Sequence, residues 1–298
     1  MTLEQLRLFV AVAEREHMTR AAEALNITQS AVSAAIKTLE ERHDVALFHR
    51  IGRRIELTGA GRVFLIEARA VLGRAASAER ALAEFGGLER GTLTLVASQT
   101  IASYWLPPYL AAFRDLYPGV AVTLSIGNSG AAADQVRVGT AELGFVEGVI
   151  DDPALARWTL GHDDLALVGK DAATAPINAD WIRSARWVLR EEGSGTRSTF
   201  AAALAAFGLK LADLDVTLTL PSNEAVRSAV AAGAGYTVLS TLVVEPLIQA
   251  GTLHRVPFVI EPRPFYGLRH KERYRSKAGD ALIALIEAHG ATVRYATT

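Results

Sequence analysis

The sequence contains no cysteine in its 298 residues. Without thiols the chain has no disulfide, no thiolate nucleophile and none of the strongest protein ligands for structural metals. Its charge is also nearly balanced, because 31 lysines and arginines face 32 aspartates and glutamates. No overall basic field therefore marks a nucleic-acid partner. The function of the chain therefore has to be inferred from individual polar residues and their places in the predicted elements.

Hydrophobic runs of membrane-spanning length are also missing. The N-terminal stretch MTLEQLRLFVAVAERE is amphipathic and contains acids, and it lacks the basic, apolar and cleavage regions of a signal peptide. We therefore expect a cytoplasmic protein that does not enter a membrane. Half of the residues are hydrophobic and 21% are charged, as in ordinary globular proteins, and the length allows two or three domains.

The common catalytic motifs are absent as well. The chain has no Gly-x-x-x-x-Gly-Lys loop, no His-Glu-x-x-His helix and no Gly-x-Ser-x-Gly elbow. His162, Asp163 and Asp164 are consecutive, a spacing that does not suit one helical face, and they fall where we expect a crossover between lobes. We predict no catalytic residue, no metal site and no cofactor.

What the sequence does contain is a run of short helices at its start. Hydrophobic residues recur at helical spacing over residues 3–15, and residues 18–25 form a shorter helix for which Thr19 is the expected N-cap. A third helix follows Thr28, another N-cap residue, and Val32, Ile36 and Leu39 would anchor it inward. Two short helices joined by a tight turn predict a helix-turn-helix whose last helix enters the major groove.

The outer face of that third helix carries short or flexible polar groups. Such groups can reach base edges or phosphates. We predict DNA contacts by Thr28, Gln29, Ser30, Ser33 and Lys37.

Residues 47–58 predict a two-stranded hairpin that turns at Gly52-Arg53. Arg50, Arg53 and Arg54 cluster on this wing, where they would lie against phosphates or in a minor groove. Residues 1–62 hold nine basic and eight acidic residues, so the distribution of charge is more informative than its total. An isolated run of arginines can also be a solvated surface, but the neighbouring helix-turn-helix favours DNA.

Residues 58–90 predict one long helix. Hydrophobic and small residues alternate at steps of four and three, which is the spacing of a coiled-coil seam, at Phe64, Ala68, Val71, Ala75, Ala78, Leu82 and Phe85. The helix could pack on its own domain, but the small alanines favour a dimer seam. Gly86-Gly87 would end it as a hinge.

Residues 1–62 resemble the winged helix-turn-helix of the LysR-type transcriptional regulators. The residues that carry the resemblance are Leu6, Phe9, Ala21-Ala22, Leu25, Thr28 to Ser33, Ile36, Leu39-Glu40, Leu47-Phe48, Arg50 and Leu57 to Gly61. Members of that family often have a long polar residue after the helix serine, whereas Ala34-Ala35 follow Ser33 here. The resemblance implies dimerisation through the linker helix.

From Thr92 onward, strand-like runs alternate with helical segments, which predicts an α/β architecture with parallel sheets. The strands are expected at 93–97, 120–126, 143–146, 165–168, 187–189, 216–220, 236–239 and 265–268, and the helices at 105–117, 131–138, 196–207, 224–232, 242–249 and 279–289. The resemblance implies a two-lobed effector domain like the periplasmic binding proteins.

The predicted organisation has three parts. They are a DNA-binding domain at 1–58, a linker (dimerisation) helix and hinge at 59–90, and an effector domain at 91–298, with lobe I at 91–162 and 266–298 and lobe II at 163–265.

Ligands in α/β folds bind beyond the carboxyl ends of strands. Ser98, Gln99 and Thr100 follow one predicted strand, and a Gly-rich turn with Ser194, Gly195, Thr196 and Arg197 follows another. Hydroxyls and free backbone N–H groups at helix starts favour an anion. Caps and turns use the same residue types, so the inference depends on the two stretches facing each other across a cleft.

Asn128 and Glu147 also follow strands and complete the predicted effector site. Arg197 could neutralise an anion or pair with Glu191 or Glu192, and Glu147 could recognise an amine or orient Arg197. The Arg-Glu-x-Gly-Ser-Gly-Thr-Arg run resembles a subgroup of these regulators that senses small anions or metabolites.

We therefore expect a LysR-type regulator that binds promoter DNA under the control of a small polar, anionic effector acting as co-inducer or co-repressor. The resemblance implies a homodimer, a homotetramer and contact with RNA polymerase. The alternatives are a small-molecule binding protein or an enzyme on the same two-lobed fold, and neither accounts for the leading helix-turn-helix.

Overall fold

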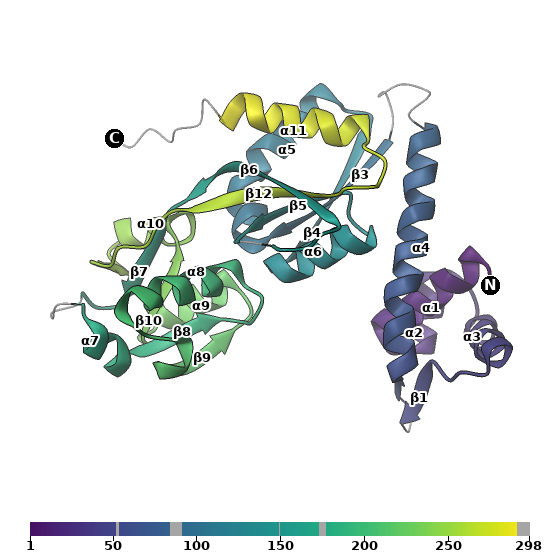
Figure 1. Cartoon of the computed structure of the whole chain (residues 1–298), viewed down its shortest axis with the longest axis horizontal. Coiled ribbons are helices and arrows are strands. Elements are labelled where there is room, and N and C mark those ends of the chain that lie inside the picture. Colours follow the sequence, from purple (N-terminus) through teal and green to yellow (C-terminus); the bar gives the residue numbers. More distant parts are fainter. Residues whose placement is uncertain (52–53, 84–90, 149, 173–176, 291–298) are drawn as a thin grey trace. The chain divides into compact units, whose positions relative to one another are not determined.

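A computed structural model describes the chain except for residues 52–53, 84–90, 149, 173–176 and 291–298 (Figure 1). The chain divides into two compact units, one built from the N-terminal helices and the wing, the other from the α/β region. No helix in the described ranges is both long and apolar enough to cross a membrane.

The first unit is a winged helix-turn-helix. Its elements are α1 (Leu3–Arg15), α2 (Met18–Ala24), α3 (Gln29–His43), β1 (Phe48–Ile51), β2 (Arg54–Leu57) and α4 (Gly59–Ala83). Val32, Ile36 and Leu39 are buried, as predicted, and they share one core with Phe9. The Thr28 hydroxyl accepts a hydrogen bond from the backbone N–H of Ala31 at 3.2 Å, which confirms this N-cap.

The N-cap that we predicted for α2 is wrong. His17, not Thr19, caps this helix, and its ring accepts from the backbone N–H of Arg20. The helix therefore begins one residue before Thr19, which lies in its first turn. Asn26 adopts a left-handed backbone with φ of 55°, and this makes the tight turn into α3.

The wing is an antiparallel pair in which Phe48 faces Leu57 and Ile51 faces Arg54. The hairpin prediction is therefore confirmed for its strands. Gly52 and Arg53, where we predict the turn, lie outside the described residues, as do the side chains of Arg50 and Arg54.

Helix α4 is continuous over 25 residues. Two of the predicted seam positions are used inside the first unit, because Ala68 is buried in its core and the Phe64 ring lies 4.8 Å from that of Phe9. Val71 and Leu82, by contrast, are exposed. The seam as we drew it is thus wrong at its beginning, and Phe85 and Gly86-Gly87 lie outside the described residues.

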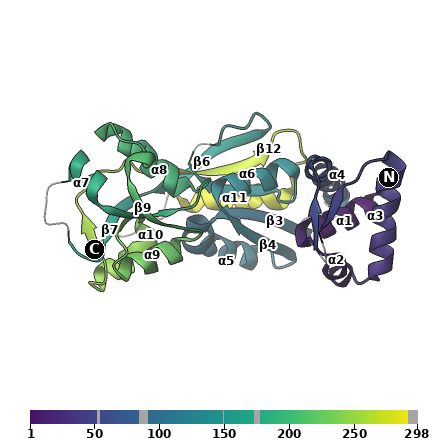
Figure 2. The same ribbon diagram turned by 90° about the horizontal axis from the view of Figure 1, so that it is seen from below.

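The second unit contains two five-stranded sheets in two lobes (Figure 2). The first sheet has the order β4-β3-β5-β12-β6, and the second has the order β11-β7-β10-β8-β9. The strands are β3 (Gly91–Ser98), β4 (Val120–Gly127), β5 (Leu143–Glu147), β6 (Leu155–Asp163), β7 (Leu165–Gly169), β8 (Arg186–Arg190), β9 (Asp215–Leu220), β10 (Tyr236–Ser240), β11 (His254–Val256) and β12 (Arg263–His270).

Helices cover these sheets. They are a π-helical turn at Ile101–Trp105, α5 (Pro107–Leu116), α6 (Ser129–Val138), α7 (Ala179–Ser184), α8 (Gly195–Leu204), α9 (Asn223–Ala231), α10 (Thr241–Gln249) and α11 (Lys277–Gly290), with 3-10 turns at Ala205–Phe207 and Leu211–Asp213. β5 and β7 are buried along their whole length, which explains their unbroken hydrophobic sequences.

The sheets are mixed, so our prediction of parallel sheets is wrong. β12 runs antiparallel to both β5 and β6, and β7 runs antiparallel to β10 and β11. The reason is topological, because the chain passes from the first sheet to the second after β6 and returns after β11. The first sheet includes Asp163 and residues Arg263 to Phe265, which we had assigned to lobe II. We also missed β6, β11 and the short helix α7.

Candidate functional site

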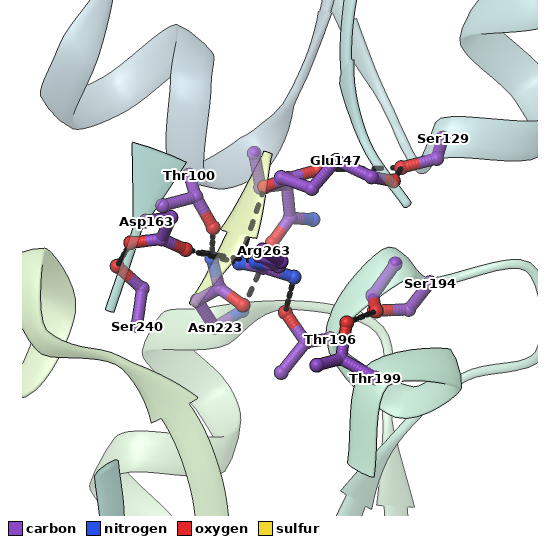
Figure 3. A network of polar contacts seen from close by, with 12 residues as sticks. Thr100, Ser129, Glu147, Asp163, Ser194, Thr196, Thr199, Asn223, Ser240 and Arg263 are labelled. Carbon is purple, nitrogen blue, oxygen red and sulfur yellow. Dashed lines mark hydrogen bonds and ion pairs between the residues drawn. The ribbon is translucent and has the colours of Figure 1, made fainter. Parts of the chain in front are cut away.

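The polar ends of the strands meet where the two lobes face each other (Figure 3). Ser98 and Thr100 follow or end β3, Glu147 ends β5, and Ser194 and Thr196 lie at the start of α8. All five side chains are buried, although each is polar. Burial of so many hydroxyls and charges is costly unless they are bonded, so their partners define the site.

Gln99 and Thr100 bond to the start of α9 in the other lobe. The Gln99 side chain donates to the Pro221 carbonyl and accepts from the Asn223 backbone N–H, both at 2.9 Å. The Asn223 amide donates to the Thr100 hydroxyl at 3.1 Å. The β3 end and the α9 start are therefore held together across the lobes.

Arg263, at the start of β12, lies at the centre of this network (Figure 3). Its Nε and Nη2 atoms donate to Asp163 Oδ2 at 2.8 and 2.6 Å, and its Nη1 donates to the Thr196 hydroxyl at 3.0 Å. Glu147 Oε1 lies 3.6 Å from Nη2. One buried guanidinium thus joins two carboxylates and a threonine from the opposite lobe.

The carboxyl group of Asp163 is held in a buried position. Burial raises the pKa of Asp163 above its ordinary value, and the Glu147 charge adds to the rise. Arg263 and the Ser240 hydroxyl, which donates to Oδ1 at 2.6 Å, act in the opposite direction. The raised pKa means that burial outweighs the stabilisation of the charge by its partners.

A second set of contacts joins the β4–α6 connection of the first lobe to the Gly-rich turn before α8. The Asn128 amide donates to the Glu192 carbonyl at 3.2 Å and to Glu191 Oε1 at 3.4 Å. Gly195 packs so closely that a Cβ atom there would lie 2.4 Å from the Glu147 carbonyl oxygen. Only glycine allows this approach of the two lobes.

Arg190, at the end of β8, is a second buried arginine. Its Nε and Nη2 donate to the two carboxylate oxygens of Glu191 at 2.8 and 2.9 Å, and its Nη1 donates to Asn223 Oδ1. Arg197, which we proposed to neutralise a ligand or to pair with Glu191 or Glu192, instead donates to the Arg190 carbonyl at 2.9 Å. Glu147 correspondingly faces Arg263 and not Arg197.

Ser98 differs from the other members of the site. Its hydroxyl oxygen is buried and has no hydrogen-bond partner within the part of the chain that the structure describes. A buried hydroxyl without a partner costs free energy. It is therefore a place where a bound group would gain a hydrogen bond.

The structure also brings in residues that we did not include in the predicted site. They are Asp163, Arg190, Asn223, Ser240 and Arg263. The sequence does carry a signal for three of them. Asp163, Arg190 and Arg263 are charged residues that adjoin strands whose sequences predict burial. Groups of three or more acidic or histidine residues suited to a metal are absent from the described residues.

In the first unit, the face of α3 opposite its core carries the predicted DNA contacts. Gln29, Ser30 and Lys37 are exposed and Ser33 is half-buried. Lys37 Nζ lies 3.4 Å from Glu41 Oε1, so this lysine is partly neutralised by its own helix.

Two family models match the chain in agreement with this architecture. Residues 3–62 match the bacterial regulatory helix-turn-helix protein of the lysR family, and residues 86–291 match the LysR substrate binding domain. The chain belongs to the LysR family. It is a LysR-type transcriptional regulator with an effector-binding domain.

Relatives of this LysR regulator match over nearly its whole length. The HTH-type transcriptional regulator YeiE of Escherichia coli is 32% identical over 283 residues, which cover 93% of this chain and 94% of YeiE. Among solved structures, CbnR complexed with its target DNA has a TM-score of 0.65 at 23% identity and covers 97% of this chain and 100% of that one.

The regulatory domain of CcmR from Synechocystis PCC6803, in complex with 2-PG, has a TM-score of 0.61 at 21% identity. It covers 68% of this chain and 99% of that chain. At these identities the two structures show that the fold is shared.

Proposed function

We propose that this LysR-type regulator binds promoter DNA through α3 and the wing, and that a small oxyanion held between the lobes of its effector domain controls that binding. The proposal is carried by the buried hydroxyl of Ser98, which has no hydrogen-bond partner among the described residues although it lies beside a network of bonded polar groups. The complex of CcmR with 2-PG, which is 2-phosphoglycolate, supports an anion of this kind.

We assign the DNA contacts to Thr28, Gln29, Ser30, Ser33 and Lys37 on α3, and to Arg50, Arg53 and Arg54 on the wing. Exposure of the α3 face supports this assignment. Residues 1–58 would form the reading head, residues 59–90 a linker that dimerises and ends in a hinge, and residues 91–298 the effector domain. The complex of CbnR, which shares this fold, with its target DNA supports DNA binding by this chain.

We assign effector binding to Ser98, Gln99, Thr100, Asn128, Glu147, Ser194, Gly195 and Thr196, joined by Arg190 and Arg263. Arg197 supports the turn through the Arg190 carbonyl and stays in the site only in this indirect role. Gln99, Thr100, Asn128 and Thr196 are hydrogen-bonded across the lobes, so a ligand that enters must exchange some of those bonds. A ligand that binds the two arrangements unequally would shift their populations.

DNA binding is tested with labelled DNA from the region upstream of the protein's own gene, by fluorescence anisotropy over a range of salt. We expect Ser33→Ala to weaken specific binding, whereas Thr38→Ala, on another face of α3, should bind as the parent does. Arg53→Ala should weaken binding to all sequences and reduce the salt slope by about one. Absence of salt-sensitive binding by the parent refutes the assignment.

Effector binding is tested by a thermal-shift screen of the full chain against small carboxylates, sulfate and phosphate, because a specific ligand raises stability by mass action. Thr100→Val and Thr196→Val should each weaken the response. Thr199→Val is the matched control, because Thr199 lies in α8 and its side chain, within the described ranges, bonds only to the Gly195 carbonyl of its own helix. If both site variants respond as the parent does, the ligand binds elsewhere.

A further inference from the structure

The guanidinium of Arg190 is already bound by a carboxylate of its own chain. Arg190 is 4% exposed, and two of its nitrogens donate to the two oxygens of Glu191 at 2.8 and 2.9 Å. This is the fork geometry with which arginine binds carboxylate, sulfate or phosphate ligands. The third nitrogen of the guanidinium donates to Asn223, which in turn donates to Thr100 of the other lobe.

The carboxylate of Glu191 lies between donors from both lobes. Besides Arg190, which belongs to the second lobe, it accepts from the Asn128 amide of the first lobe at 3.4 Å. Its oxygens therefore occupy positions that a small oxyanion would occupy if it bridged the lobes at this point. The carboxylate is also next to the turn at Gly193, which has φ of +83°.

The charges of the interlobe network argue against simple addition of an anion. Two arginines, Arg190 and Arg263, face three carboxylates, those of Glu147, Asp163 and Glu191. An anionic ligand would add a fourth negative charge to a buried site, and that is costly in a low-dielectric environment. The ligand can enter at lower cost if it takes the place of a carboxylate that leaves.

Glu191 is the carboxylate best placed to leave. The side chains of Asp163 and Glu147 are 0% and 4% exposed, whereas that of Glu191 is 27% exposed and can turn into water. Asp163 is also held by Ser240 and by two bonds from Arg263. A group that regains its hydration on leaving loses less free energy than one that stays buried without a partner.

We infer that Glu191 is a built-in surrogate for the effector, and that the effector is a small oxyanion which displaces Glu191 and binds Arg190 through two oxygens. This inference rests on the proposed interlobe function. It assigns Arg190 as the group that binds the effector and Glu191 as the side chain that competes with the effector for Arg190. Exchange of the Glu191 carboxylate for a singly charged oxyanion keeps the charge of the site constant, and a doubly charged one adds a single charge where simple addition would add two. Displacement of Glu191 also breaks its hydrogen bond with Asn128 of the first lobe. It alters the surroundings of Arg190, which is connected to the first lobe through Asn223 and Thr100.

The test measures binding of sulfate, phosphate and acetate to the full-length chain by isothermal titration calorimetry, with sodium chloride at matched ionic strength. Glu191→Gln keeps the size of the side chain but removes its charge, so we expect at least one of these anions to bind about tenfold or more tightly than to the parent. Arg190→Lys in the Glu191→Gln background keeps the positive charge but removes the fork. It should reverse that gain.

Glu192→Gln is the matched control. It removes the same charge one residue further on, from an exposed side chain that makes no ion pair or hydrogen bond among the described residues. Its affinity should stay within about twofold of the parent, since exposed charges are screened. Glu191→Asp, which keeps the charge but shortens the reach to Arg190, should show a smaller gain and guards against a folding defect in the glutamine variant.

The outcomes separate the two proposals. If Glu191→Gln binds no anion more tightly than Glu192→Gln does, or binds none of the three, the surrogate role is refuted. If the parent binds an anion and Glu191→Gln binds it more weakly, Glu191 helps to hold the ligand and the inference is again refuted, while the interlobe effector site stands. The effector site itself is decided by the Thr100 and Thr196 variants.

Discussion

Replacement of Arg263 by methionine should destabilise the effector domain strongly. The arginine is 3% exposed and joins Asp163, Glu147 and Thr196, so the substitution leaves two buried carboxylates without their counter-ion. Methionine fills similar volume and adds no charge, so the effect measures the lost ion pairs more than a lost shape. A large loss of stability would mean that the contacts of Arg263, which reach from the first lobe to Thr196 of the second, stabilise the domain.

The size of the effect follows from burial. Removal of one partner from a buried ion pair costs about 3–5 kcal/mol, because the remaining charge stays in a poorly solvated place. For a unit of about 200 residues, each kcal/mol lowers Tm by about 2–4 °C, so we expect a decrease of about 6–20 °C. Protonation of Asp163, whose pKa is raised by burial, would make the loss smaller at acidic pH.

Tryptophan fluorescence is a selective assay for this change. The chain has four tryptophans, Trp105, Trp158, Trp181 and Trp187, and all of them lie in the effector domain. Thermal unfolding followed by tryptophan emission therefore reports this domain and not the winged helix-turn-helix. Melts at pH 7 of the parent and the variant give the decrease in Tm directly.

Arg255→Met is the control with the same substitution. Arg255 pairs with Glu245 at 2.7 Å, but both side chains are more than two-fifths exposed, and such pairs contribute only about 0–1 kcal/mol. If Arg263→Met lowers Tm no more than Arg255→Met, the reasoning about buried charge is refuted. Adding Asp163→Asn to Arg263→Met should recover part of the loss, since it removes one of the orphaned charges.

Three further predictions concern single groups. Because burial raises the pKa of Asp163, the folded state takes up a proton at this carboxyl more readily than the unfolded chain does. The parent should therefore gain stability relative to Asp163→Asn as pH falls from neutral to about 4. If urea melts give free energies of unfolding that differ between the two proteins by the same amount at every pH in this range, the prediction is contradicted. Gly195→Ala should destabilise the domain by about 1–3 kcal/mol in urea melts, because its Cβ would clash with the Glu147 carbonyl, whereas Gly91→Ala, which meets open space, should stay within about 0.5 kcal/mol; equal effects would exclude the close approach. Glu41→Gln should strengthen promoter binding at low salt in anisotropy titrations by releasing Lys37 from its ion pair, and an unchanged affinity would argue against a DNA contact by Lys37.

The elements of this protein follow from local patterns in the sequence. Thr28 caps α3 because its hydroxyl reaches a backbone N–H only three residues away, and the unbroken hydrophobic runs of β5 and β7 require central, fully covered strands. The hydroxyls of Ser98, Thr100, Ser194 and Thr196 stand directly at strand ends or helix starts. Their place in an α/β fold is therefore predictable from the order of elements alone.

The pairing of charges depended on the tertiary structure. Arg263 meets Asp163 across 100 residues of sequence, and Arg197 donates to a backbone carbonyl although its position allowed either an anion or a pair with Glu191 or Glu192. The direction of β12, the burial of Ala68 and the packing of Phe64 against the same core were likewise beyond the local pattern. A capping bond or a buried strand is set by residues within a few positions of each other. An ion pair or the direction of a strand depends on which distant part of the chain returns beside it, and the same local sequence is compatible with many such partners.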